Sequence, residues 1–129
     1  MPLQDGPASR PLIGIVGPCG SGKSTLALRL AHQGLGARAI AQEHSYVPAM
    51  WQRITNPSLL VYLEASYLVC TRRRQLAWTE REYEEQLRRL AHAHAHADLR
   101  VDTDPLTPDE VLTAVLGGLG LEDPSRQGV

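Results

Sequence analysis

Residues 17–25, with the sequence GPCGSGKST, combine the residue types and the spacing that bind phosphate. They fit the phosphate-loop pattern G-x-x-x-x-G-K-[ST], with both glycines, the lysine and the hydroxyl in place. Glycine lets the main chain come close to a triphosphate, so that a run of backbone N–H groups binds its oxygens. The residues predicted here to bind a nucleotide are Gly17, Cys19, Gly20, Ser21, Gly22, Lys23, Ser24 and Thr25.

The lysine and the hydroxyl of this stretch have separate predicted roles. We expect Lys23 to place a compact positive charge on the β- and γ-phosphates, and Ser24 to offer its hydroxyl to Mg²⁺. Lys23 is also the one lysine among the thirteen basic residues of the chain. A sequence that otherwise uses arginine therefore has its single lysine where the motif requires one.

A phosphate loop needs a strand before it and a helix after it, and the flanking sequence predicts both. Residues 11–16 are an apolar run, typical of a parallel strand that is buried on both faces. Residues 22–33 predict a helix, and Gly34 fits the position just past its end. The start of this helix adds free N–H donors and the positive end of its dipole to the loop.

The rest of the chain alternates predicted strands with predicted helices. Capping boxes at Thr79/Glu82 and Thr107/Glu110 mark the starts of two helices. The alternation predicts an α/β fold, a three-layer αβα sandwich around a mostly parallel sheet of about four or five strands. Further strands are expected at 37–41, 59–63 and 99–101, a helical turn at 50–54, and helices at 65–75, 79–97 and 107–116.

Polar residues follow three of the predicted strands. These are Glu43 and His44 after the second strand, Glu64 after the third and Asp102 after the last. In a parallel sheet, ligands bind beyond the carboxyl ends of the strands. We therefore expect these side chains to face one crevice together with the phosphate loop.

Length and composition predict one soluble domain. The chain has 129 residues, 43% of them hydrophobic, and a net charge of −1, which gives no case for binding nucleic acid or an anionic membrane. No apolar run approaches the ~18 residues of a transmembrane helix, and no signal peptide is recognisable. With only two cysteines, Cys19 and Cys70, the chain fits the reducing cytoplasm. We expect a domain at 11–121, a flexible leader at 1–10 and a disordered tail at 122–129.

Three segments resemble the P-loop small-molecule kinases, the group of the adenylate, shikimate, gluconate and adenylylsulfate kinases. The first is the loop at 17–25. The second is VYLEAS at 61–66 with Arg72, which is similar to a late strand of the group and an arginine one helix later. The third is ADLRVDT at 97–103 with LTPDEV at 106–111, which is similar to the last strand and helix.

The resemblance implies the P-loop NTPase fold, ATP or another nucleoside triphosphate, Mg²⁺, and transfer of the γ-phosphoryl group to a small acceptor. In these kinases an acid after the second strand contacts the acceptor or metal-bound water, and lid arginines stabilise the transferring group. Asp104 and Pro105 would border the adenine. The implied catalytic residues are Lys23, Glu43, His44, Arg72 and Arg73, and the implied magnesium ligands are Ser24 and Glu43.

The chain also departs from the kinase pattern. Residues 46–58 contain no strand that ends in the usual Walker B acid, and no acceptor-binding domain is recognisable. Either the acceptor is small, or a second copy completes the site in a homodimer, or the chain turns nucleotide over slowly. Three functions stay open: a phosphotransferase acting on a small metabolite or nucleotide, a slow hydrolase of nucleoside triphosphates, and a non-catalytic nucleotide-binding sensor module.

Structural roles compete with functional ones for several residues. Glu64 also suits the start of a helix, and Cys19 is either a reactive thiol at a helix N-terminus or a small loop residue. Of the three arginines at 72–74, at most two can face one crevice, because adjacent helical positions diverge. His92 and His96 share a helix face at a metal-binding spacing, but the sequence supplies no third ligand.

Overall fold

The computed structural model describes residues 11–121 of the chain. The predicted leader at 1–10 and the predicted tail at 122–129 lie outside these residues. Four strands form one sheet, in the order β2-β1-β3-β4, and every neighbouring pair is parallel. The strands are β1 (Leu12–Val16), β2 (Gly36–Ala39), β3 (Leu59–Glu64) and β4 (Leu99–Asp102). The predicted α/β class and parallel sheet are therefore confirmed.

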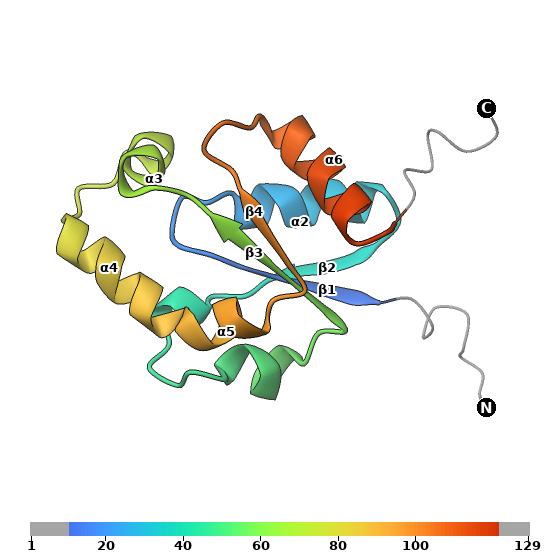
Figure 1. Ribbon diagram of the computed structural model, residues 1–129, viewed down its shortest axis with the longest axis horizontal. Helices are drawn as coiled ribbons and strands as arrows, with labels where there is room; N and C mark the ends of the chain where they lie inside the picture. The colour runs from blue at the N-terminus through green and yellow to red at the C-terminus, as the bar shows by residue number, and fades with distance from the viewer. Residues whose placement is uncertain (1–10, 122–129) are drawn as a thin grey trace.

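Helices cover both faces of this sheet (Figure 1). α2 and α6 lie on one face, and α4 and α5 lie on the other. A short helix, α3, lies beyond the carboxyl end of β3. The helical elements are α2 (Lys23–His32), η1 (Gln42–His44, 3₁₀), η2 (Trp51–Thr55, π), α3 (Tyr67–Arg74), α4 (Glu80–Arg89), α5 (Ala91–His96) and α6 (Pro108–Gly118).

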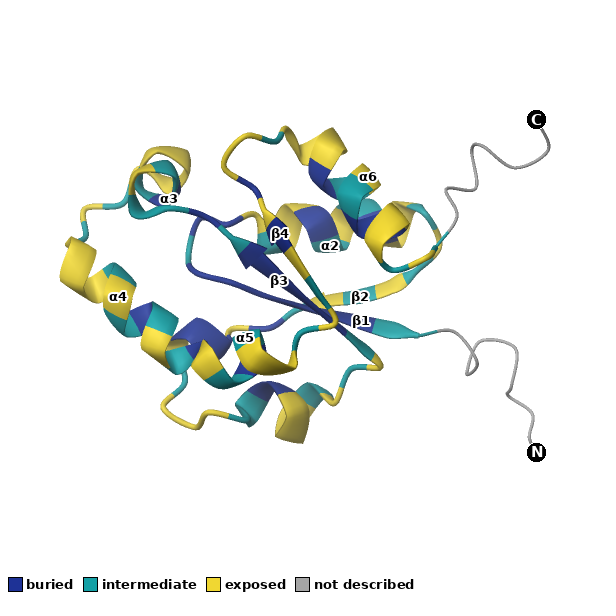
Figure 2. Cartoon of the chain, viewed as in Figure 1, coloured by how far each residue is buried: buried dark blue, intermediate teal, exposed yellow. Residues whose placement is uncertain are grey.

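The two central strands hold the core together because their side chains alternate between the faces. In β3, Val61 and Leu63 pack with α2 and α6, whereas Leu60 and Tyr62 pack with α5 and η2. β1 and β3 are buried almost throughout, and the edge strands β2 and β4 are more exposed (Figure 2). The apolar runs at 12–16 and 59–63 are thus central strands, as their continuous hydrophobicity predicts.

Both predicted capping boxes are present, at Thr79 with Glu82 and at Thr107 with Glu110. The predicted helix at 79–97 is wrong in one respect, because it is interrupted at Leu90, which separates α4 from α5. Leu90 is fully buried and has the backbone angles φ −92 and ψ −4. The break lies where the sequence has no Gly or Pro to mark it.

The segment at 46–58 contains η2 and no strand, as expected. β2 consequently lies directly beside β1, and η1 follows β2 at the carboxyl edge of the sheet. The final helix runs through Gly118, two residues beyond the predicted end at 116. No helix among residues 11–121 is long and apolar enough to cross a lipid bilayer.

Candidate functional site

The loop of residues 17–25, called here the glycine-rich loop, joins the buried end of β1 to the start of α2. Three of its glycines are required by geometry, and the first is Gly17, which has φ 156 and on which a Cβ would lie 2.6 Å from the carbonyl oxygen of Leu63. Gly20 has φ 88, and a Cβ on it would lie 2.7 Å from the carbonyl oxygen of Cys70. Gly22 is the N-cap of α2 and has φ 100, in the left-handed region that disfavours residues with a side chain. The loop can therefore turn sharply into α2 while it packs directly on α3.

The start of α2 presents unpaired backbone donors. The first helical hydrogen bond runs from the Leu26 N–H to the carbonyl oxygen of Gly22, at 3.0 Å. Within residues 11–121, no hydrogen bond is donated by the N–H groups of Gly22, Lys23, Ser24 or Thr25. Four such donors at the positive end of a helix dipole form a site that favours an anion.

The ammonium group of Lys23 lies across the glycine-rich loop. Its Nζ donates to the carbonyl oxygens of Gly17, at 2.9 Å, and Pro18, at 3.2 Å. It also forms an ion pair with Oε2 of Glu43, at 2.9 Å. The side chains of Lys23 and Glu43 are only 12% and 4% exposed, so the two charges compensate each other where water is largely excluded.

One carboxylate oxygen of Glu43 is unpaired within residues 11–121. Its Oε2 binds Lys23, but its Oε1 is buried and has no hydrogen-bond partner among the described residues. A buried carboxylate oxygen without a donor is costly, and proteins normally pair such atoms with a donor, a water or a cation. Glu43 contacts the glycine-rich loop at Lys23 and Cys19, so its carboxylate lies beside the loop.

Cys19 and His44 lie next to Glu43. The Cys19 Sγ is 3.4 Å from Nε2 of His44 and 3.8 Å from Oε2 of Glu43. Gln86 of α4 fixes the cysteine, since its Oε1 accepts from the Cys19 N–H at 3.0 Å and its Nε2 donates to Sγ at 3.3 Å. Among the described residues, Cys19, Glu43 and His44 are the one group of three side chains arranged to hold a metal ion.

A guanidinium group borders the loop on the opposite side. Arg73 donates to the hydroxyl of Thr103, at 3.0 Å, and to its carbonyl oxygen, at 2.7 Å. It also reaches the carbonyl oxygen of Gly20, at 3.4 Å. Arg73 thereby connects α3, the glycine-rich loop and the end of β4. Arg74 lines the cavity as well, whereas Arg72 is exposed and does not.

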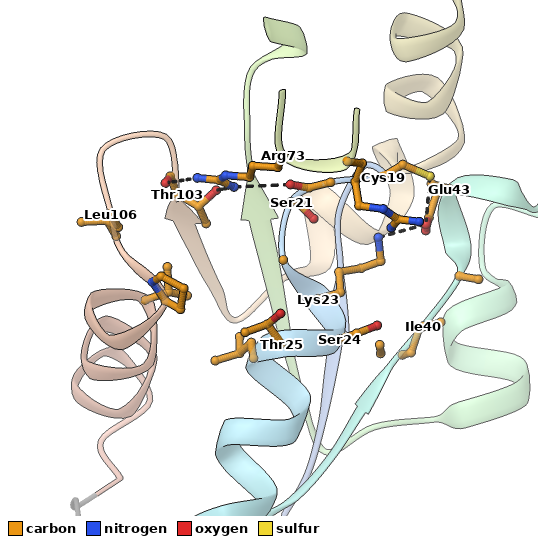
Figure 3. Close-up of a pocket in the computed structure, with 18 of the residues that line it drawn as sticks. Cys19, Ser21, Lys23, Ser24, Thr25, Ile40, Glu43, Arg73, Thr103 and Leu106 are labelled. Carbon is orange, nitrogen blue, oxygen red and sulfur yellow. Dashed lines mark hydrogen bonds and ion pairs between the residues drawn. The ribbon is translucent and has the colours of Figure 1, made fainter. Parts of the chain in front are cut away.

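These side chains surround one open cavity of about 570 Å³ (Figure 3). The glycine-rich loop and Glu43 form its polar end, and Leu106, Pro108 and Val111 form an apolar wall. Gly17 is not in the lining, because its carbonyl group binds Lys23 from behind the loop. The predicted site residues that line the cavity are Cys19, Gly20, Ser21, Gly22, Lys23, Ser24, Thr25, Glu43, His44 and Arg73.

Four residues that the sequence predicted to lie at this site do not line the first cavity. Glu64 and Asp102 do not line this first cavity; they line a second cavity of about 520 Å³ on the α4/α5 side, to which the glycine-rich loop contributes Pro18. The two residues are paired in register and point to the same face of the sheet, the face opposite Leu63 and Val101. Asp104 and Pro105 line neither cavity, although their neighbours Thr103 and Leu106 line the first.

Structural roles explain several of the remaining polar residues. Asp104 accepts a hydrogen bond from the Ser66 N–H, at 2.9 Å, and the N-cap of α3 is Ser66, not Glu64. Glu64 instead lies 3.0 Å from Nε2 of His94. His92 accepts from the indole of Trp51, at 3.1 Å, and stacks on His96, which accounts for the histidine row without a metal.

Sequence reasoning missed two residues of the site, Gln86 and Thr103, whereas Arg74 belongs to the arginine cluster at 72–74 that the sequence analysis considered. Gln86 carries a readable signal, because it stands between the apolar positions Tyr83, Leu87 and Leu90 on the inner face of a predicted helix. A polar residue on such a face needs a partner, and here the partner is the loop. Thr103 carries no comparable signal.

The second cysteine is a structural residue. Cys70 is fully buried beneath Gly20, and burial raises the pKa of its thiol to about 11, although the positive charge of Arg73 opposes this shift. The Cys70 thiol is therefore neutral at physiological pH, and Cys19 is the accessible sulfur of the site.

Comparison with known protein families and curated proteins identifies no relative of this chain. No protein-family model matches the chain, and no curated protein matches it in sequence. The residues of the site and their geometry therefore carry the functional interpretation.

Proposed function

We propose that the chain binds the Mg²⁺ complex of ATP or another nucleoside triphosphate and transfers the γ-phosphoryl group to a small metabolite or nucleotide. One observation carries the proposal: the glycine-rich loop turns at Gly20 and Gly22 and leaves four backbone donors unpaired beside the ammonium group of Lys23. This would make the domain a reduced P-loop NTPase with a four-stranded sheet. The resemblance to small-molecule kinases supports the same reading.

Phosphate binding requires Lys23 to exchange partners. Its three present partners are two loop carbonyl oxygens and the Glu43 carboxylate. A triphosphate brings several anionic oxygens to the same place and competes for the ammonium group, while the unpaired N–H groups bind other oxygens. The nucleotide base then has the apolar wall of Leu106, Pro108 and Val111 available, at the other end of the cavity.

Glu43 takes the place of the acid that the sequence lacks between residues 46 and 58. β2 neighbours β1 directly, so that η1 brings Glu43 to Lys23. The unpaired Oε1 of Glu43 and the Ser24 hydroxyl, which has no partner among residues 11–121, are oxygen ligands of the type that suits Mg²⁺. When bound, Mg²⁺ would neutralise charge on the phosphate oxygens.

Arg73 supplies a second positive charge near the loop. Its guanidinium group is held by Thr103 and Gly20 in a fixed position, and positive charge fixed in advance stabilises negative charge that grows in a transition state. Arg74 lies on the same cavity. Arg73 is therefore the arginine to which we assign stabilisation of the transferring phosphoryl group, and no role is assigned to Arg72.

A slow hydrolase is the second candidate, favoured by one specific observation. The cavity is open to solvent, so water has access to the loop. Water would then be the acceptor, with Glu43 and His44 near it. A sensor that binds nucleotide without turnover is the third candidate.

Turnover measurements on the full chain separate the three. Incubation with Mg-ATP, with and without pools of small metabolites, is followed by release of ADP and of inorganic phosphate. We expect ADP production that rises with an acceptor, without matching release of phosphate. Acceptor-independent release of phosphate identifies a hydrolase, and binding without turnover identifies a sensor. No binding of any nucleoside triphosphate contradicts the proposal.

A further inference from the structure

We propose that Cys19, Glu43 and His44 form a binding site for a divalent transition-metal ion of the zinc class. The three ligand atoms already stand in a triangle. Sγ and Nε2 are 3.4 Å apart, Nε2 and Oε2 are 3.7 Å apart, and Oε2 and Sγ are 3.8 Å apart. The residues come from two segments, the glycine-rich loop and η1, and Figure 3 shows Cys19 and Glu43 directed toward each other.

The size of this triangle fits zinc. A circle through three points with these separations has a radius of about 2.1 Å, so one position is equally close to all three ligand atoms. Zinc takes bond lengths of about 2.3 Å to sulfur, about 2.0–2.1 Å to histidine nitrogen and about 2.0–2.2 Å to carboxylate oxygen. An ion displaced slightly from the plane of the triangle meets these lengths with little movement of the protein.

The Glu43 carboxylate can bind this ion and keep its ion pair with Lys23. Glu43 holds Lys23 through Oε2, and its Oε1 is buried without a partner in the described part of the chain. The triangle is closed by Oε2, whose second lone pair can bind a metal while the first keeps the ammonium group of Lys23, and Oε1 remains as an additional oxygen for the ion. The unpaired Oε1 is thus an independent sign that a cation belongs at this position.

The identity of the ligands selects the class of ion. Thiolate and imidazole are preferred by zinc and similar transition metals, whereas magnesium prefers oxygen ligands and water. The hydrogen bond from Gln86 to Sγ orients the cysteine and stabilises the thiolate, as outer-shell partners of zinc ligands do. Binding releases the thiol proton to solvent, and three protein ligands leave a fourth position for water on the cavity side.

The ion can reach the site from solvent. The His44 side chain is 58% exposed, and Cys19 is partly exposed on the same cavity. No nucleotide is needed for binding, so the site is testable separately from the function proposed above.

Titration of the full chain with Co²⁺, without nucleotide, is the test. Co²⁺ takes the place of zinc and absorbs in the near ultraviolet when a thiolate is bound to it. We expect this charge-transfer band in the wild type, its retention in Cys70→Ala and its loss in Cys19→Ser. Zinc, but not a large excess of magnesium, should remove it. Absence of the band, its survival in Cys19→Ser, or its removal by magnesium would overturn the proposal.

The histidine provides a second variant that preserves the fold, since His44 is exposed. We expect His44→Gln to weaken Co²⁺ binding by more than about tenfold, because even outer-shell partners of metal ligands contribute that much. His32→Gln, an exposed histidine on α2, is the matched control and should leave the affinity unchanged. Unaltered affinity in His44→Gln would contradict a three-ligand site.

Discussion

Glu43 is the residue on which the chemistry of the site depends most. It is buried, it neutralises Lys23, and it keeps one oxygen unpaired. No other acid among residues 11–121 lines this cavity. Its two proposed partners, magnesium with a nucleotide and zinc without one, use this same carboxylate and are therefore alternatives.

The substitution Glu43→Gln should separate binding from turnover. It removes a carboxylate that competes with phosphate for Lys23 and also one proposed magnesium ligand, and because these two effects oppose each other we expect the affinity for Mg-ATP to change little. Turnover should fall by about a hundredfold or more, the usual effect of losing a group that acts in the transition state. Steady-state kinetics and equilibrium titration measure the two effects. Glu64→Gln, on the second cavity, is the control. Equal losses of affinity and turnover would remove Glu43 from a catalytic role.

At the scale of elements, the glycine-rich loop is held from both sides. α4 holds it through Gln86 and Cys19, and α3 holds it through the contact of Gly20 with Cys70 and through Arg73. The loop therefore keeps its shape through packing and side-chain hydrogen bonds, because few of its own backbone groups are paired.

Gln86 of α4 should stabilise the glycine-rich loop. The substitution Gln86→Met keeps the volume of the side chain but leaves the Cys19 N–H without its acceptor. We expect a loss of about 1–3 kcal/mol in the free energy of unfolding, the cost of an unsatisfied donor, together with weaker triphosphate binding. Urea unfolding and nucleotide titration measure these effects. Gln52→Met, at an exposed position of η2, should change neither. If both variants behave alike, α4 does not position the loop.

Alanine substitutions at Gly20 and at Gly117 in α6 should change the stability of the protein in opposite directions. In Gly20→Ala, the new Cβ meets the backbone of Cys70 at a left-handed φ, so we expect a loss of roughly 2–4 kcal/mol in stability. In Gly117→Ala, nothing lies within 4 Å of the new Cβ, and the helix should gain about 0.5–1 kcal/mol. Thermal unfolding of both variants measures the difference. A Gly20→Ala protein as stable as the wild type would show that the loop does not pack on α3 as described.

Whether a feature could be predicted from the sequence depends on how far apart its residues lie along the chain. The central strands, the start of α2 and both capping boxes could be predicted, because each depends on residues close together in the chain. The loop residues and Glu43 could be placed from motif and resemblance. The role of Gln86 at the site was not predicted because its partner, Cys19, is 67 residues away in the sequence. Glu64 and Asp102 were assigned to the wrong cavity because the sequence places them at a sheet edge without showing which face they point to.

At the scale of the whole molecule, one buried thiol and two buried or half-buried phenol groups predict a loss of stability at alkaline pH. Burial raises the pKa of Cys70 from 9.0 to about 11 and that of Tyr83 from 10.0 to about 12, and it raises the pKa of Tyr62 as well. Below about pH 8 these groups are neutral in both the folded and the unfolded chain. As the pH rises further, the unfolded chain loses the protons first, so stability falls.

We expect Cys70 alone to account for a loss of about 2 kcal/mol by pH 11, at 1.36 kcal/mol for each unit of pKa. Urea unfolding at pH 8, 9, 10 and 11 measures it. The slope with pH should be shallower in Cys70→Ala, because that variant lacks the titrating thiol. A free energy of unfolding that stays constant over this range would contradict the described burial of these side chains.

The central claim is that the glycine-rich loop binds a nucleoside triphosphate through its backbone donors and the ammonium group of Lys23. Calorimetric titration of the full chain with Mg-ATP and Mg-GTP tests it most directly, in wild type, Lys23→Ala and the exposed-charge control Arg53→Ala. We predict saturable binding in the wild type and the control. In Lys23→Ala we predict a loss of affinity of about tenfold or more, since hydrogen bonds to charged groups contribute roughly 1.5–3 kcal/mol. Absence of binding in the wild type, or equal affinity in a folded Lys23→Ala protein, would contradict the claim.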